Sequence, residues 1–361
     1  MALTQVQDGM LGYDGGSFAN RNRIINGDMR IDQRNAGASI SATNAGYMID
    51  RWIYGSTQAG KFTAQQTTTA PVGFKNSLKL TTASAVTIGA SDAFAIEQRI
   101  EGLNCSDLGF GFSDAKTLTL SFWVRSSLTG TFGGYFINSA FNRSYPFAYT
   151  ISSADTWEQK TVTVAGDTSG TWLTTNGIGI RVGFSLGTGS NYSATAGAWT
   201  GSIATSVTGA TSVVGTLNAT FYITGVQLEV GSVATPFEHR LYGQELALCQ
   251  RYYYKWSNDN SSSNTVYPFT FQAYSTTSAF GKLIDFPVQM RSSPSCVLNG
   301  TFYPHTAVGA SGGDFTNMTD VRTTSTSLSA GGFTGASGLV TGNATGIGAL
   351  SNATITINAE L

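Results

Sequence analysis

Regular alternation of apolar and polar residues predicts β-strands along most of this chain. The clearest example is the segment 117–125, where every second residue is apolar. One face carries Leu118, Leu120, Phe122 and Val124, and the other carries Thr119, Ser121, Trp123 and Arg125. Period-2 alternation is typical of a strand with one buried face. Segments 159–164 and 221–230 alternate similarly, and Gly225 interrupts the second where we predict a β-bulge.

The strand-like segments are separated by clusters of Gly, Ser, Thr and Asn, and a helical pattern is clear only over 241–251. This order predicts an all-β fold, with an antiparallel jelly-roll β-sandwich over residues 23–238. We expect residues 1–22 to form an extended arm and the tract 187–215 to form loops at one end of the sandwich. A helical connector over 239–256 and a second, smaller β domain over 257–361 complete the prediction.

The composition predicts a protein surface with few charged residues. Charged residues make up 11% of the 361 residues, against about 25% in an average soluble protein. Hydrophobic residues reach 41%, which is enough for a core. The surface must therefore consist largely of Ser, Thr, Asn, Gln and Gly. The net charge of −1 argues against a nucleic-acid partner, and the absence of a long apolar run argues against membrane insertion.

Cysteine usage and the first residues bear on the compartment. Cys105, Cys249 and Cys296 are few and widely spaced, which predicts free buried thiols rather than disulfides or a zinc site. The start of the sequence lacks the basic and apolar regions of a cleaved secretion signal. We expect synthesis in a reducing cytoplasm and release by lysis.

Several segments resemble a module of tail fibre proteins from tailed phages and prophages. They are NRIINGDMRIDQRNAG (22–37), GYMIDRW (46–52), AIEQRIEGLN (95–104), LTLSFWVRSSLTGTFGG (118–134), TWEQKTVTVAGDTSGTW (156–172) and FYITGVQLEVGSVATPFEHRLYGQELALCQRYY (221–253). The resemblance implies a homotrimeric, receptor-binding fibre in the virion, attached to a tail or baseplate protein through residues 1–22. It also implies a host surface polysaccharide or lipopolysaccharide as receptor.

The sandwich is similar, more distantly, to jelly-roll carbohydrate-binding modules. The similarity lies in Asn26-Gly27-Asp28-Met29 and in the strand at 221–223. Many such modules carry an Asp in that last strand, where this chain has Thr224 and Gly225. A structural calcium ion is therefore unsupported, and we expect no cofactor.

The candidate glycan-binding residues are aromatic or polar side chains outside the predicted core. Aromatic faces stack on pyranose rings, and polar groups pair with hydroxyls. In the sandwich the candidates are Trp123 and Arg125 on one strand face, and Tyr192 and Trp199 in loops; packing inside the protein is the alternative role for each aromatic. In the distal domain, which would form the fibre tip, they are Tyr267, Tyr303 and His305.

Catalysis has little support in the sequence, so we expect a binding protein rather than an enzyme. The two histidines are His239 and His305. Carboxylates such as Asp28, Glu97 and Glu229 could serve as the catalytic pair of a glycosidase. However, arginines alternate with most of the acidic residues along the sequence, which favours structural ion pairs. The alternatives to a tail fibre are a tailspike-type glycan depolymerase and a non-viral bacterial lectin or adhesin.

Overall fold

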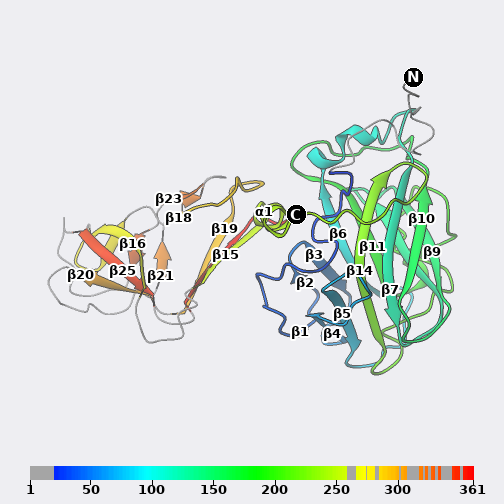
Figure 1. The fold of residues 1–361 in the computed structure, drawn as a ribbon, viewed down its shortest axis with the longest axis horizontal. Coiled ribbons are helices and arrows are strands. Elements are labelled where there is room, and N and C mark those ends of the chain that lie inside the picture. The colour runs from blue at the N-terminus through cyan, green and yellow to red at the C-terminus, as the bar shows by residue number, and fades with distance from the viewer. Residues whose placement is uncertain are drawn as a thin grey trace, which may run out of the picture. The chain divides into compact units, whose positions relative to one another are not determined.

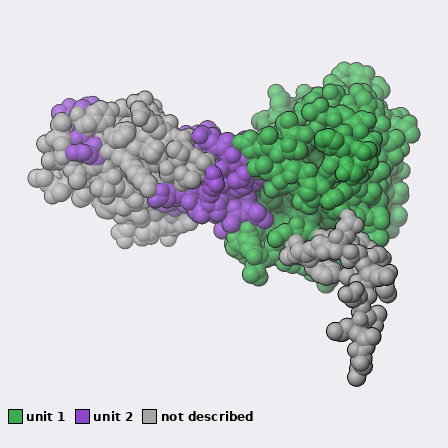
Figure 2. Space-filling model, turned by 90° about the horizontal axis from the view of Figure 1, so that it is seen from above, with its two compact units in different colours: residues 1–245, 361 green, residues 246–360 purple. Residues whose placement is uncertain are grey.

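The computed structural model describes residues 20–257, 266–273, 275–280, 284–300, 302–306, 317–319, 322–323, 327–329, 332–334, 344–349 and 353–361. The described residues divide into two compact units at Glu245, with Leu361 assigned to the first (Figure 2). The expected connector 239–256 is thus shared between them. The expected arm lies outside the described residues except at 20–22, where Asn22 is buried and its side-chain amide donates to the Val226 carbonyl at 3.1 Å.

Unit 1 is a sandwich of two six-stranded sheets in which every strand pair is antiparallel (Figure 1). Sheet A has the order β1 (Ile40–Ser41), β4 (Phe62–Thr67), β5 (Ser77–Thr82), β14 (Thr220–Val230), β7 (Leu118–Ser126), β10 (Glu158–Val164). Sheet B has the order β2 (Ala45–Ile49), β3 (Trp52–Ser56), β6 (Ala93–Glu101), β11 (Ile178–Thr188), β8 (Gly130–Ile137), β9 (Ser144–Ile151). The chain passes repeatedly from one sheet to the other, as in a jelly roll. The predicted antiparallel β-sandwich is confirmed.

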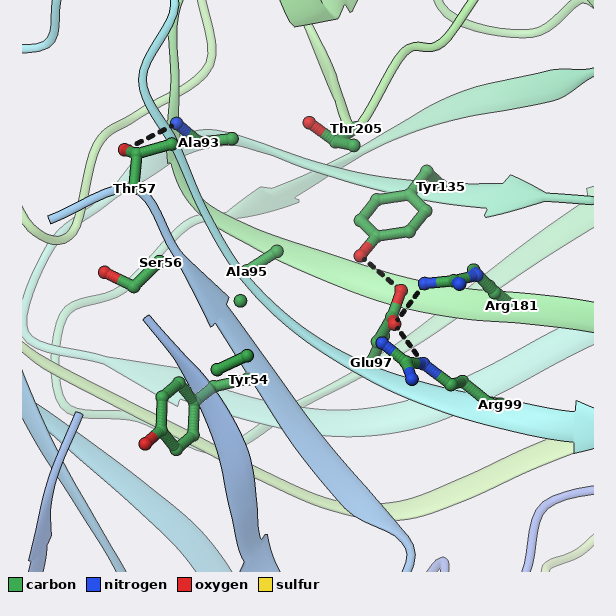
Figure 3. Close-up of a pocket in the computed structure, with 12 residues that line it drawn as sticks. Tyr54, Ser56, Thr57, Ala93, Ala95, Glu97, Arg99, Tyr135, Arg181 and Thr205 are labelled. Atoms are coloured by element: carbon green, nitrogen blue, oxygen red, sulfur yellow. Dashed lines mark hydrogen bonds and ion pairs between the residues drawn. The ribbon is translucent and has the colours of Figure 1, made fainter. Parts of the chain in front are cut away.

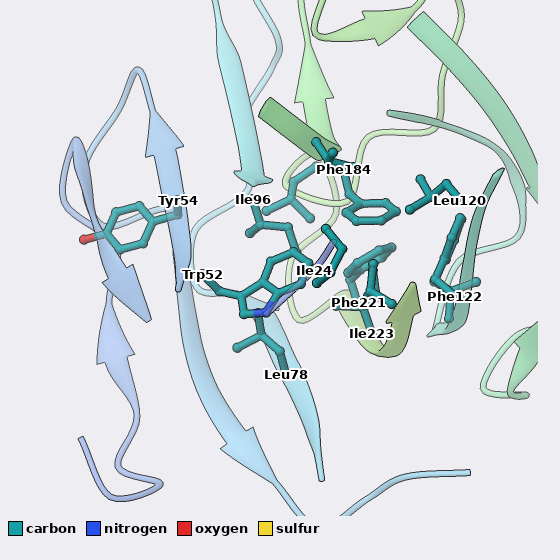
Figure 4. Packing of buried hydrophobic residues seen from close by; sticks show 14 of the residues in the cluster. Ile24, Trp52, Tyr54, Leu78, Ile96, Leu120, Phe122, Phe184, Phe221 and Ile223 are labelled. Carbon is teal, nitrogen blue, oxygen red and sulfur yellow. The ribbon is translucent and has the colours of Figure 1, made fainter. Parts of the chain in front are cut away.

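The core lies between the two sheets and is rich in aromatic rings (Figure 4). The apolar face predicted for 117–125 points into it, and Leu118, Leu120, Phe122 and Val124 are all fully buried. Phe122 of sheet A meets Phe184 of sheet B with ring centroids 4.9 Å apart. Burying a side chain of this size stabilises the fold by about 2 kcal/mol. Because the alternation gathers these apolar side chains on one face of sheet A, their burial favours packing of that face against sheet B.

The predicted bulge at Gly225 is confirmed. The pairing of β14 with β7 shifts register between Thr224 and Gln227. Gly225 has a φ of +61°, in the left-handed region that glycine adopts without the strain other residues meet.

The tract 187–215 corrects one expectation. Strand β11 continues to Thr188, and the following short parallel ribbon, β12 (Ser193–Ala194) with β13 (Ser206–Val207), packs against β8 and β9 instead of only extending the end of the sandwich. Glycine in β8 makes room for this ribbon, because a Cβ on Gly133 would lie 2.3 Å from Ser206 Oγ. The sequence shows the small residues but not which surface they approach.

The described part of unit 1 also contains three short 3₁₀ helices: η2 (Gly102–Asn104), η3 (Ser106–Leu108) and η4 (Ser190–Tyr192). The one α-helix of the described residues, α1 (Tyr242–Gln250), matches the helical pattern at 241–251 and contains the division between the units. No helix in the described part of the chain combines the length and apolar character needed to cross a bilayer.

Unit 2 is also built from strands. A three-stranded sheet has the order β15 (Tyr253–Ser257), β26 (Thr354–Asn358), β19 (Ser295–Asn299). A six-stranded sheet has the order β20 (Phe302–Thr306), β25 (Ala344–Ala349), β16 (Val266–Ala273), β17 (Ser278–Phe280), β24 (Gly332–Thr334), β21 (Asn317–Thr319). A further three-stranded sheet has the order β18 (Ile284–Asp285), β23 (Ser327–Ser329), β22 (Arg322–Thr323).

Candidate functional site

The outer face of sheet A brings together the two candidates on β7. Trp123 pairs with Gln159 of β10 on one side and with Thr224 of β14 on the other. Arg125, two residues along the same face, pairs with Tyr222 of β14. Trp123 and Arg125 are both half-buried, which leaves part of each side chain open to solvent.

Around Arg125 the side chains form a row of cations and aromatic rings. The Arg125 guanidinium carbon lies 5.2 Å from the centre of the Tyr222 ring, and Lys79 Nζ lies 5.7 Å from it. The Trp157 ring meets the Tyr222 ring edge-on at 6.1 Å. Arg125 Nη2 donates to the exposed carboxylate of Asp155 at 3.3 Å. We call Lys79, Trp123, Arg125, Trp157 and Tyr222 together the Trp123 face.

The bulge in β14 lets two aromatic side chains approach the strand beside this face. A Cβ on Gly225 would lie 2.6 Å from Phe74 Cζ and 3.0 Å from Trp123 Cδ1. Phe74 packs in turn on Phe237 at 5.1 Å and on His239 at 5.5 Å. Glycine at position 225 is therefore what allows the Trp123 ring to lie close to the backbone of its neighbouring strand.

The other half of the same sheet face is covered by the chain that follows β14. The Glu229 carboxylate accepts hydrogen bonds from Thr235, at 2.9 Å from the backbone nitrogen and 2.6 Å from the hydroxyl. The Gln227 side-chain carbonyl accepts one from the Glu238 backbone nitrogen at 2.8 Å. Glu229 is thus enclosed and fully engaged in holding the end of the sandwich.

The interleaved arginines and carboxylates form ion pairs, as their spacing suggested. Arg30 Nε lies 2.8 Å from Asp28 Oδ2, and Arg99 Nε lies 2.8 Å from Glu97 Oε1. Burial raises the pKa of Asp28, an effect that the Arg30 charge partly offsets. Among residues 20–257 and the other described segments, no group of three or more His, Cys, Asp or Glu side chains could hold a metal ion.

A pocket of about 280 Å³ opens on sheet B (Figure 3). It is lined by Ala45, Tyr54, Gly55, Ser56, Thr57, Ala93, Ala95, Glu97, Arg99, Tyr135, Arg181 and Thr205. At one side, the Glu97 carboxylate accepts hydrogen bonds from the Tyr135 hydroxyl at 3.0 Å, from Arg181 Nη1 at 2.9 Å and from Arg99 Nε at 2.8 Å. Burial, with the Glu97 charge second, raises the pKa of Tyr135 well above its ordinary value of 10.

The register of sheet B explains where this pocket is hollow. Ala45, Gly55 and Ala95 are direct partners across β2, β3 and β6, so three small residues lie in one row. In the next row, Glu97 pairs with Gly183, and Gly183 with Tyr135. A Cβ on Gly183 would lie 2.1 Å from Tyr135 Cζ, so glycine lets the tyrosine ring lie against the sheet and reach Glu97.

The two loop candidates lie apart from the Trp123 face. Trp199 packs edge-on against Phe110 at 5.8 Å, Tyr145 at 5.3 Å and Trp172 at 5.4 Å, and its Nε1 donates to the Ala165 carbonyl at 2.7 Å. Tyr192 ends η4, and its carbonyl accepts from the Thr205 backbone nitrogen at 2.8 Å. The contacts of Trp199 correspond to the packing alternative considered for it.

The three distal candidates lie in one sheet of unit 2. Tyr303 and His305 are two residues apart on β20 and pair with Gly348 and Gly346 of β25. Tyr267 lies on β16, the other neighbour of β25, within the register shift between Val266 and Phe269.

Lys79, Trp157, Tyr222 and the pocket on sheet B are not among the candidates predicted from the sequence. Tyr222 carried a usable signal, because it alternates with the apolar residues Phe221 and Ile223 and so falls on the outer face. Trp157 and Lys79 carried none, because their proximity to Tyr222 depends on how β10, β7, β14 and β5 are ordered in the sheet.

No protein-family model matches the chain, and no curated protein matches it. Among solved structures, the enzymatically active domain of tailspike protein 4 of bacteriophage CBA120 is 12% identical over 58% of this chain, with a TM-score of 0.32. The matched region spans 21% of that tailspike chain.

Two sugar-binding proteins are also similar. A putative sugar-binding protein from Bacteroides thetaiotaomicron is 12% identical, with a TM-score of 0.33 and coverage of 58% of this chain and 99% of that one. The family 11 carbohydrate-binding module of Clostridium thermocellum, in complex with a β-1,3-1,4-mixed-linked tetrasaccharide, is 9% identical, with a TM-score of 0.29 and coverage of 57% and 100%.

Proposed function

We propose that this protein is a structural component of a phage tail fibre and binds a host cell-surface glycan through the Trp123 face. The observation that carries the proposal is the arrangement of two half-buried indole rings, Trp123 and Trp157, beside the Arg125 guanidinium. The resemblance of residues 22–253 to tail fibre modules supports the phage context.

The Trp123 face has the chemistry that sugar binding needs. An indole ring offers a flat apolar surface to the C–H groups of a pyranose, while guanidinium and amide groups donate to its oxygens. Here Arg125 and the exposed Gln159 side chain flank Trp123 on the same face. Binding on an open sheet face suits a long polysaccharide, because the chain can run on past the aromatic residues.

The assembly that we propose is a homotrimer in the virion, joined to a tail or baseplate protein through residues 1–22 and released by host lysis. The scarcity of charged residues supports this, since small hydroxyl and apolar side chains pack closely between subunits. Sedimentation in dilute buffer tests it, and a stable monomer would contradict the trimer. We propose binding without turnover; new reducing ends in the polysaccharide would instead indicate a depolymerase.

Substitution of Trp123 tests the binding site. Trp123→Ala should weaken adsorption to host cells or purified surface polysaccharide by tenfold or more, corresponding to about 1.4 kcal/mol or more. Phe112→Ala is the matched control, because Phe112 is an aromatic residue of the same unit that is 67% exposed and lies outside the Trp123 face. Equal adsorption by the Trp123 variant and the wild-type protein would overturn the assignment.

A further inference from the structure

The pocket on sheet B presents hydrogen-bond donors at one side. Both oxygens of the Glu97 carboxylate already accept hydrogen bonds, Oε1 from Arg99 and Arg181 and Oε2 from Tyr135. Arg99 Nη1 is also engaged, by the Leu361 carbonyl oxygen at 2.5 Å. A ligand at this side therefore meets cationic N–H groups rather than an available carboxylate.

Arg181 is the donor that is left for a ligand. Its Nη1 binds Glu97 and its Nε is enclosed without a hydrogen-bond partner among the described residues, so Nη2 is the nitrogen that a ligand would reach. The Phe141 ring lies against its guanidinium carbon at 4.3 Å. Because the group is held on two sides and is 9% exposed, its orientation is fixed before any ligand arrives.

The opposite side of the pocket presents an acceptor. Thr57 Oγ1 donates its proton to Asp92 at 2.9 Å and accepts a hydrogen bond from the Ala93 backbone nitrogen at 3.2 Å. A hydroxyl carries one proton and two lone pairs, so Thr57 Oγ1 keeps one lone pair with which to accept from a ligand. Figure 3 shows Ser56 and Thr57 on one side of Ala95 and the Glu97 cluster on the other.

The space between these two sides fits one sugar residue. At about 280 Å³ the pocket lies near the lower end of the range for small-molecule sites. Its middle is bounded by Ala45, Gly55 and Ala95, and a Cβ on Gly55 would meet nothing within 4 Å. These small apolar side chains leave room for the body of a ring without offering it hydrogen bonds.

We propose that this pocket binds a single acidic sugar residue of the uronic acid type, with its carboxylate toward Arg181 and a hydroxyl donating to Thr57. A planar guanidinium matches a carboxylate, and the Thr57 oxygen matches a sugar O–H group, so the ligand needs acceptors at one end and a donor at the other. The site lies on the sheet opposite the Trp123 face and does not depend on that face binding glycan.

Ligand-observed NMR on the full chain tests the proposal with D-glucuronic acid, D-glucose and inorganic phosphate as probes. We expect glucuronic acid to bind at least tenfold more tightly than glucose, and its binding to weaken as salt is added. Gly55→Val fills the pocket without touching the charged groups, on a strand position that a β-branched residue suits. It should abolish glucuronic acid binding, whereas Trp123→Ala and Gly201→Ala should leave it unchanged.

The outcomes separate the possibilities. Equal binding of glucose and glucuronic acid, or undiminished binding by Gly55→Val, would overturn the proposal. Binding of phosphate without glucuronic acid would show a general anion site and would also overturn it. Arg181→Gln should reduce the preference for glucuronic acid over glucose to less than threefold. If the Arg181 variant does not fold, the Gly55→Val result decides whether the proposal stands.

Discussion

The Tyr135 hydroxyl on β8 donates a hydrogen bond of 3.0 Å to the Glu97 carboxylate on β6, across the intervening strand β11. Gly183 of β11 makes this possible, because any side chain there would occupy the space of the tyrosine ring. The bond ties three strands together on the side of sheet B that faces away from the core.

Removing this hydroxyl should destabilise unit 1. Tyr135→Phe leaves one oxygen of a carboxylate that is 7% exposed without its donor, and hydrogen bonds to charged groups contribute about 2 kcal/mol. Urea denaturation followed by tryptophan fluorescence measures the change. A loss below about 0.5 kcal/mol would mean that water replaces the hydroxyl, which the burial of both residues argues against.

The same pair predicts a loss of stability in alkali. Because burial raises the pKa of Tyr135 in the folded state above its unfolded value of about 10, the tyrosine contributes its stability fully below pH 10. That contribution falls as the pH rises above 10, since the unfolded chain releases the proton more easily. The wild-type protein should therefore lose more stability between pH 9 and pH 11 than Tyr135→Phe does.

Gly225 should not tolerate a side chain. Gly225→Ala places a Cβ in contact with Phe74 and Trp123 and also strains a backbone at φ +61°. We expect a loss of at least about 1 kcal/mol in unfolding free energy and weaker glycan adsorption. Gly201→Ala is the control, since a Cβ there meets nothing within 4 Å. Wild-type stability and adsorption of the Gly225 variant would show that the bulge can relax.

Trp199 should matter for stability and not for adsorption. Trp199→Ala removes the ring from a cluster of three aromatic neighbours, at a cost of roughly 3 kcal/mol, whereas Trp199→Phe should cost less. Thermal unfolding and cell adsorption are measured on the same preparations below the melting temperature. Selective loss of adsorption in the folded Phe variant would return Trp199 to the binding surface.

The thiols should be unreactive in the native protein. Burial raises the pKa of Cys105 and of Cys296 to about 12, so only about one thiol in ten thousand is ionised at pH 8. Cys249 is fully buried. A thiol reagent at pH 8 should label the protein slowly until denaturant is added. Rapid native labelling of any of the three would contradict this.

The sandwich could be predicted because the positions that alternate as apolar in the sequence are the positions buried between the sheets. Phe122 and Val124 are apolar because they face the core, and Trp123 and Arg125 were found because they occupy the intervening positions. The bulge was visible for a similar reason, since a glycine that interrupts alternation inside a strand commonly marks a bulge.

The pocket could not be predicted because its residues meet only through strand order. Glu97 and Arg181 lie 84 positions apart and become neighbours because β6 pairs with β11. The position of the ribbon over β8 and β9 could not be predicted for a related reason. Gly133 signals that some part of the chain approaches closely, but nothing local identifies Ser206 as the residue that does so.

The place of β14 in sheet A has a consequence for how the protein is made. This strand is the last of the sheet in the chain, yet it lies between β5 and β7, which have no other connection in the sheet. Until residue 230 has left the ribosome, sheet A can exist only as two separate pieces, each with an unpaired inner edge. Closure then requires contacts across most of the unit at once, which makes folding slow. During synthesis those open edges are exposed to pairing with other nascent chains.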